Sequence, residues 1–155
     1  MFCFQCQETA GNNGCTRKGV CGKTDQVSNL QDLLVDSLRT LAVFALEFND
    51  DALAEEDVDV HIIKGLFVTV TNVNFDASRI REYIRDTRKK RDVLRKPLIE
   101  SHGAEYVDRL DMRLPDPYPS DSDAEQMDLQ SEGSTVLRDE DEDIRSQIGR
   151  ASCRE

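Results

Sequence analysis

Residues 28–48, SNLQDLLVDSLRTLAVFALEF, carry the clearest helical pattern in this chain of 155 residues. Apolar side chains recur there at spacings of three and four, which places them on one face of a helix. Ser28 precedes the pattern and belongs to the residue types that cap helix amino termini. The stretch therefore predicts an amphipathic helix that begins near Ser28. Its apolar face contains Leu30, Leu34, Leu38, Leu41, Ala45 and Phe48.

The next apolar stretch, residues 61–75 (HIIKGLFVTVTNVNF), is ambiguous. Val alternating with Thr suits a strand, whereas the spacing of Ile63, Phe67 and Val70 suits one face of a helix. Periodicity alone does not decide between the two, so both interpretations stay open.

Asp76 is a candidate cap for a further helix. Pro97 is expected to kink or end that helix near Lys96, because proline lacks an amide hydrogen and crowds the preceding turn. Gly103 allows a second break, and residues 104–114 could form a short last helix. The apolar side of the long helix contains Ile80, Tyr83, Ile84, Val93 and Leu94.

Three helices joined by short turns are typical of an antiparallel bundle. The fold class is therefore mainly α: a cysteine-rich loop over residues 1–27, then a three-helix bundle over 28–114. From residue 115 the sequence becomes polar and rich in proline and serine, so residues 115–138 are expected to form a disordered acidic linker. Residues 139–146 resemble the truncated start of a second helical bundle.

The charge of the chain, −11 overall, is concentrated in one segment, since residues 116–146 hold 11 acidic and 2 basic side chains. No basic face suggests a nucleic-acid partner. No apolar run approaches the roughly 20 residues that cross a membrane, and no leader sequence precedes Cys3. These features predict a cytoplasmic protein with neither nucleic acid nor membrane as a partner.

The final residues, IGRASCRE (148–155), match the translation of a common sequencing adapter. We therefore expect residues 147–155 to be translated adapter, and the native sequence of this fragment to end near Ser146. Cys153 is set aside for that reason. Four cysteines remain.

Those four are Cys3, Cys6, Cys15 and Cys21, separated by two, eight and five residues. In a reducing compartment, clustered thiols serve as metal or redox ligands more often than as disulfides. The spacing favours an iron–sulfur cluster, whose ligand loop varies widely in length. Structural zinc is the second interpretation, although zinc sites favour close pairs with about two to four intervening residues. Disulfide or thiol redox chemistry is the third.

The stretches MFCFQCQETA (1–10), GVCGK (19–23) and LQDLL (30–34) together resemble the amino terminus of the hybrid-cluster protein family, also called prismane proteins or hydroxylamine reductases. TNVNFD (71–76) and EDIRS (142–146) continue the resemblance. The similarity covers nearly all of residues 1–146 and is least in the acidic linker.

The resemblance implies an iron–sulfur oxidoreductase that reduces hydroxylamine to ammonia and water, with nitric oxide reduction also attributed to the family. It implies that Cys3, Cys6, Cys15 and Cys21 hold a [4Fe–4S] cluster, which relays electrons from a redox partner protein to a hybrid iron–sulfur–oxygen cluster. The ligands of that second cluster lie downstream of this fragment, so the fragment alone is expected to be inactive. The alternatives are a zinc-stabilised helical interaction module and a complete electron-transfer protein.

Several other residues are expected to have no role in the site. His61 and His102 are interpreted as surface or core residues rather than metal ligands. Glu8, beside Cys6, is expected to stay in solvent. The charged run RKKRDVLRK (88–96) is interpreted as a largely solvated helix face. No set of serine, histidine and carboxylate suggests hydrolysis.

Overall fold

The chain folds into helices that pack around one long central helix. The structure, a computed structural model, describes residues 1–134 except 4–5, 7–10, 12–13, 48–55 and 71–74. In those residues the regular elements are helices, and a single isolated β-bridge pairs Cys3 with Cys15. This confirms the prediction of a mainly α protein. The helices are α1 (Asp25–Leu46), α2 (Glu56–Val70), α3 (Ala77–His102), α4 (Ala104–Asp111) and α5 (Ala124–Gly133).

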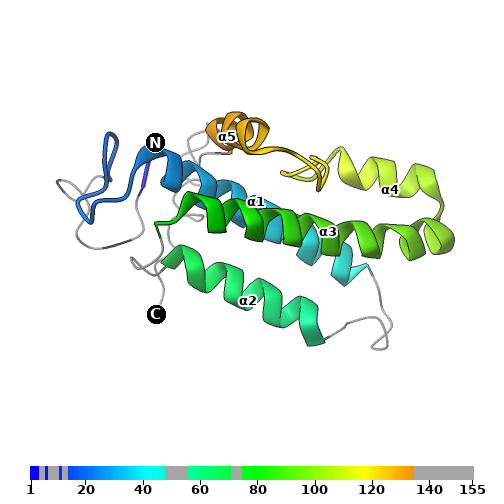
Figure 1. The fold of residues 1–155 in the computed structure, drawn as a ribbon. Helices are drawn as coiled ribbons and strands as arrows, with labels where there is room; N and C mark the ends of the chain where they lie inside the picture. The colour runs from blue at the N-terminus through cyan, green and yellow to red at the C-terminus, as the bar shows by residue number, and fades with distance from the viewer. Residues whose placement is uncertain (4–5, 7–10, 12–13, 48–55, 71–74, 135–155) are drawn as a thin grey trace.

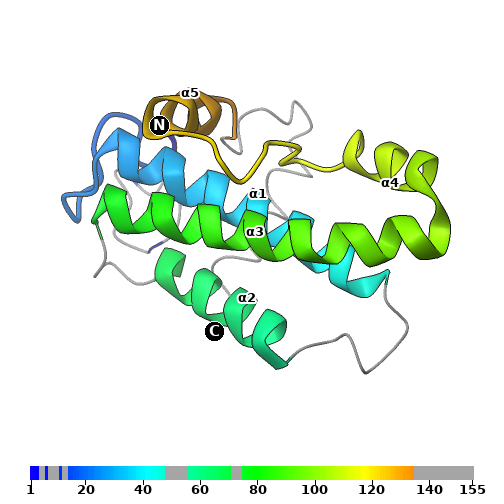
Figure 2. The same cartoon turned by 45° about the vertical axis from the view of Figure 1, so that its right-hand side comes forward.

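The helices α1, α2 and α3 alternate in direction, as an antiparallel bundle requires (Figure 1). Helices α1 and α3 lie side by side along most of their length, and α2 packs against them. Helix α4 turns back over the end of α3, and α5 lies on α1 (Figure 2). None of the helices in the described part of the chain is long and apolar enough to span a membrane.

Helix α1 begins earlier than the sequence pattern indicated. Thr24, not Ser28, is the cap, and its hydroxyl accepts a hydrogen bond from the Val27 amide at 3.3 Å. Ser28 lies inside the helix and is buried. Both residues have capping side chains, but the apolar contact of Val27 with the core extends the helix to Thr24.

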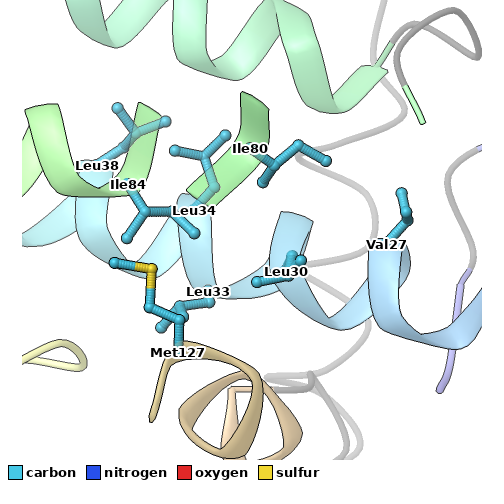
Figure 3. Packing of buried hydrophobic residues seen from close by; sticks show 8 residues of the cluster. All are labelled: Val27, Leu30, Leu33, Leu34, Leu38, Ile80, Ile84 and Met127. Carbon is cyan, nitrogen blue, oxygen red and sulfur yellow. The ribbon is translucent and has the colours of Figure 1, made fainter. Parts of the chain in front are cut away.

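The core consists of two apolar clusters along α1. The first joins α1 to α3 and α5, and Figure 3 shows Met127 of α5 reaching toward it. The second joins the far end of α1 to α2, α3 and α4. Each fully buried aliphatic side chain contributes about 1.5–3 kcal/mol. The first cluster contains Val27, Leu30, Leu33, Leu34, Leu38, Ile80, Ile84 and Met127, and the second Leu41, Phe44, Val58, Leu94, Leu98 and Val107.

The ambiguous stretch that follows is helical through residue 70, as α2. Gly65 is buried where α2 meets α1, and a Cβ added there would lie 2.7 Å from Cδ1 of Leu38. The missing side chain therefore lets the two helices approach closely, which compensates for the low helix propensity of glycine. The stretch is therefore a helix and not a strand up to residue 70, and it packs closely against α1 at Gly65.

Helix α3 confirms one predicted boundary and contradicts another. The Asp76 carboxylate accepts hydrogen bonds from the amides of Ser78 and Arg79, as expected of a cap. Pro97, however, lies inside a helix that continues to His102, so the expectation that the helix could end near Lys96 is wrong. A proline in a helix costs ~3 kcal/mol or more. Burial of Leu94 and Leu98, on either side of Pro97, offsets that cost.

Two arginines of the charged run on α3 are buried, contrary to the expected solvated face, whereas Lys89 and Lys96 are exposed as expected. Arg88 is 1% exposed and Arg91 6% exposed. Two Arg88 nitrogens donate to the Asp116 carboxylate at 2.9 and 2.8 Å, and Arg91 donates to the carbonyl of Asp116 at 3.1 Å. Asp116 is fully buried and also accepts from the Ser37 hydroxyl. A partner distant in sequence draws these arginines inward.

The same contacts order much of the segment that was expected to be a disordered linker. After Asp116 the chain reaches α5, which begins with a capping box formed by Asp123 and Gln126. Met127 is fully buried, and Arg81 donates to both oxygens of Asp128 at 2.8 Å. The expectation is therefore wrong for residues 116–134, which contact the helices through the Arg88–Asp116 and Arg81–Asp128 ion pairs and through the buried Met127. Residues 135–155, including the predicted second-bundle start and adapter segment, lie outside the described part.

Candidate metal centre

The cysteine loop lies immediately before α1 and is closed by its own backbone. The Cys3 amide donates to the Cys15 carbonyl at 2.9 Å, and the Cys15 amide donates to the Cys3 carbonyl at 2.8 Å. Both side chains are buried, at 9% and 4% exposure. This antiparallel bridge brings together two cysteines that are twelve positions apart in the sequence.

Gly14 permits the bridge to form beside Phe2. Its φ of 107° lies in a region that residues with side chains rarely adopt. A Cβ at this position would also lie 2.7 Å from Cε2 of the Phe2 ring. Glycine is thus required on two independent grounds directly before Cys15.

A second tight turn surrounds Cys21. The Gly19 amide donates to the carbonyl of Lys23, and the Gly22 amide donates to the carbonyl of Gly19, each at 2.8 Å. A Cβ on Gly19 would lie 3.1 Å from the Cys21 sulfur and 2.9 Å from Cβ of Lys23. The absence of that atom lets the turn close, with Cys21 exposed at its tip.

Lys23 places a positive charge inside this region. Its side chain is fully buried, and Nζ lies 3.8 Å from the Cys3 sulfur and 2.6 Å from Oε1 of Gln31. Lysine is almost never fully buried unless its charge is compensated. Gln31 belongs to α1, so the central helix helps to hold the ammonium group against a cysteine.

The structure brings together only part of the predicted ligand set. Cys3 and Cys15 are paired, whereas Cys6 is half-buried and Cys21 is exposed. All four thiols are free of disulfides. Within the described ranges, no group of three or more His, Cys, Asp or Glu side chains is arranged to hold a metal ion. The assignment of all four cysteines to one centre stays a prediction.

The residues present do fit a thiolate-bound metal centre in their chemistry. Thiolate sulfur is the donor that both iron–sulfur clusters and structural zinc use. Such a centre is negatively charged, and a buried ammonium beside the Cys3 sulfur supplies the opposite charge. The two buried cysteines also lie where protein excludes part of the solvent. Donor type and local charge therefore agree with the sequence-based hypothesis.

The histidines are located elsewhere. His61, on α2, stacks on Tyr83 with ring centroids 4.4 Å apart, and its Nε2 lies 2.8 Å from Oγ1 of Thr87. His102, at the end of α3, stacks on Tyr106 at 5.0 Å. Glu8 lies outside the described residues.

Sequence reasoning missed the place of Lys23 in this region. The sequence gives no reason to expect Lys23 to be buried, because lysine side chains are almost never fully buried unless they are paired. Burial of its side chain depends on the contact with Gln31, eight residues further along the chain. Gln31, which follows Leu30 on the helix and is buried, was the available sign that a polar group lies opposite.

Comparison with known proteins gives consistent matches over almost the whole chain. A family model described as the Prismane/CO dehydrogenase family matches residues 1–151. A hydroxylamine reductase of Petrotoga mobilis is 39% identical over 149 residues, which is 94% of this chain and 27% of that protein. A hydroxylamine reductase of Desulfitobacterium hafniense is 40% identical over 146 residues, covering 94% of this chain and 26% of that protein.

A hydroxylamine reductase of Nitratidesulfovibrio vulgaris is 36% identical over 146 residues, again with 94% of this chain and 26% of the relative covered. The chain thus spans about a quarter of the length of the curated relatives that it matches.

Proposed function

Because this chain belongs to the Prismane/CO dehydrogenase family, we propose that it is the amino-terminal electron-relay part of an iron–sulfur oxidoreductase. In the whole protein the reaction is the reductive cleavage of hydroxylamine to ammonia and water, with nitric oxide as a further substrate. The observation that carries this proposal is the family match over residues 1–151, supported by relatives named hydroxylamine reductase. The cysteine loop supplies the thiol groups that such an enzyme would need to bind an iron–sulfur cluster.

The proposed cofactor of this part is a [4Fe–4S] cluster held by Cys3, Cys6, Cys15 and Cys21. When bound, such a cluster accepts and passes on single electrons. The backbone bridge holds Cys3 and Cys15 together, and the missing side chain of Gly19 leaves room beside the Cys21 sulfur. The catalytic hybrid cluster belongs to the part of the longer protein that lies beyond this chain.

The exposure of Cys21 suits electron entry from a redox partner protein, because electron transfer requires close approach to the surface. A cytoplasmic location is part of the proposal, since a reducing compartment keeps the thiols available as ligands. The fragment alone is expected to relay electrons without reducing hydroxylamine.

Anaerobic reconstitution of the 155-residue chain with iron and sulfide tests the proposal. We expect four irons and four sulfides per chain, in keeping with [4Fe–4S], and a broad brown absorption. The loaded chain should reduce hydroxylamine no faster than free-cluster controls. Purification with one colourless zinc per chain would instead support a zinc-stabilised helical module. Hydroxylamine turnover well above the controls would contradict the proposed division of labour.

A further inference from the structure

Lys23 and Gln31 form a buried polar pair between the cysteine loop and the central helix. The Lys23 ammonium donates to Oε1 of Gln31 at 2.6 Å and lies 3.8 Å from the Cys3 sulfur. Both side chains are almost inaccessible, at 0% and 1% exposure. The positive charge is therefore held at a defined position beside one predicted cluster ligand.

The Gln31 oxygen accepts a hydrogen bond from the ammonium and holds it near the Cys3 sulfur. A cluster bound by cysteine thiolates is negatively charged, and it gains a further negative charge when an electron enters. Electrostatic attraction to a nearby cation is therefore stronger in the reduced state than in the oxidised state.

The position of Lys23 is fixed from both sides along the chain. Its carbonyl accepts the Gly19 amide at 2.8 Å, within the turn that contains Cys21. Thr24, the next residue, caps α1. The backbone on either side is thus constrained, and a charge held in place needs no reorganisation when the electron arrives.

From this geometry we propose that Lys23 sets the reduction potential of the centre, by stabilising the reduced state through the charge that it holds beside Cys3. The inference rests on the proposed cluster and adds to it a residue that binds no iron. Net charge and solvent exposure are among the factors that tune cluster potentials. Lys23 is in this sense a tuning residue and not a ligand.

The test compares Lys23→Met, Lys23→Arg and Lys18→Met in the reconstituted 155-residue chain. Lys18 is the matched control, because it belongs to the same loop but is exposed to solvent. Iron and sulfide content are measured first, and the potential is then determined by reductive titration followed by electron paramagnetic resonance. Lys23→Met should make reduction less favourable by about tenfold, or 59 mV for a one-electron couple. Lys18→Met and Lys23→Arg should leave the potential close to that of the wild type.

The outcomes separate the inference from the proposed function. A wild-type chain that holds no iron–sulfur cluster would refute the proposed function itself. A loaded Lys23→Met chain with the wild-type potential would refute the inference while leaving the cluster intact. If Lys23→Met fails to load, loading of Lys23→Arg with the wild-type potential supports a role of the charge, whereas failure of both variants shows that Lys23 acts through packing alone.

Discussion

The cysteine loop, residues 1–24, and the polar segment, residues 115–134, are both poor in Leu, Ile and Val, and they differ in what holds them. The polar segment is attached to the helices through Asp116, which is buried against Arg88, and through Met127 in the apolar core. In the loop, the backbone bridge between Cys3 and Cys15 and the contact of Lys23 with Gln31 hold the chain.

The two segments also differ in how their charged or reactive side chains are arranged. The polar segment satisfies its buried carboxylate with side chains from α1 and α3. The loop instead contains free thiols, with Cys6 half-buried and Cys21 exposed at the surface. The polar segment is thus held by a buried ion pair and by Met127, whereas the cysteine loop keeps its thiols free of disulfides.

The largest effect should come from Cys15→Ser. The change removes one proposed thiolate ligand, and because a cubane cluster takes one thiolate per iron, most of the bound iron should be lost. The helical content should stay unchanged, since neither apolar cluster contains Cys15. Iron analysis and far-ultraviolet circular dichroism on the same reconstituted sample measure the two effects.

The matched control is Cys153→Ser, which removes the cysteine that lies outside the predicted ligand set. Its iron content should equal that of the wild type. Equal iron content in the two variants would show that Cys15 is not a ligand.

The second effect concerns the polar segment. Asp116→Ala leaves Arg88 buried without its counter-charge, which should lower the free energy of unfolding by about 3–5 kcal/mol. Urea denaturation measures the change. Asp121→Ala is the control, because Asp121 lies in the same segment and is exposed, and its substitution should change stability by about 0.5 kcal/mol or less. Two equally stable variants would contradict the role of the buried ion pair.

A smaller effect is expected from Met127→Ala, which deletes the apolar contact of α5 with α1 and α3. The loss of transfer free energy and the resulting cavity should cost about 2–4 kcal/mol. Leu129→Ala on the same helix is the control, because Leu129 is 65% exposed. Thermal unfolding followed by circular dichroism should show a lower midpoint for Met127→Ala only. A shift of the same size in both variants would contradict the packing role of Met127, because alanine has the highest helix propensity and does not itself weaken a helix.

Local pattern predicted those features of the fold that depend on neighbouring residues. The apolar spacing of Leu30, Leu34 and Leu38 predicted the central helix, and the Asp76 carboxylate predicted the start of α3. The possible helix end at Pro97 was a wrong prediction. The energetic cost of proline in a helix is local, whereas the burial of Leu94 and Leu98 that offsets it depends on packing against other helices. Predictions of helix boundaries fail where a contact with a residue distant in sequence outweighs a local preference.

The sequence predicts the donors of the candidate site, and this assignment stays a prediction, but the sequence did not predict the surroundings of the cysteines. Four cysteines within a short stretch predict a metal centre, because thiolates are strong ligands whatever the fold. Lys23 could not be predicted as buried, since its position depends on Gln31 and on how the loop folds onto α1.

By itself, the sequence determined the helical class and the family, and it predicted a thiolate-bound metal centre, because these depend on residue types and on spacings along the chain. Only the tertiary structure decided that Arg88 and Arg91 point inward, that α5 packs on α1, and that Lys23 lies beside Cys3. The physical reason is that the burial of a charge depends on a counter-charge or polar partner, and here those partners become neighbours only when the chain folds.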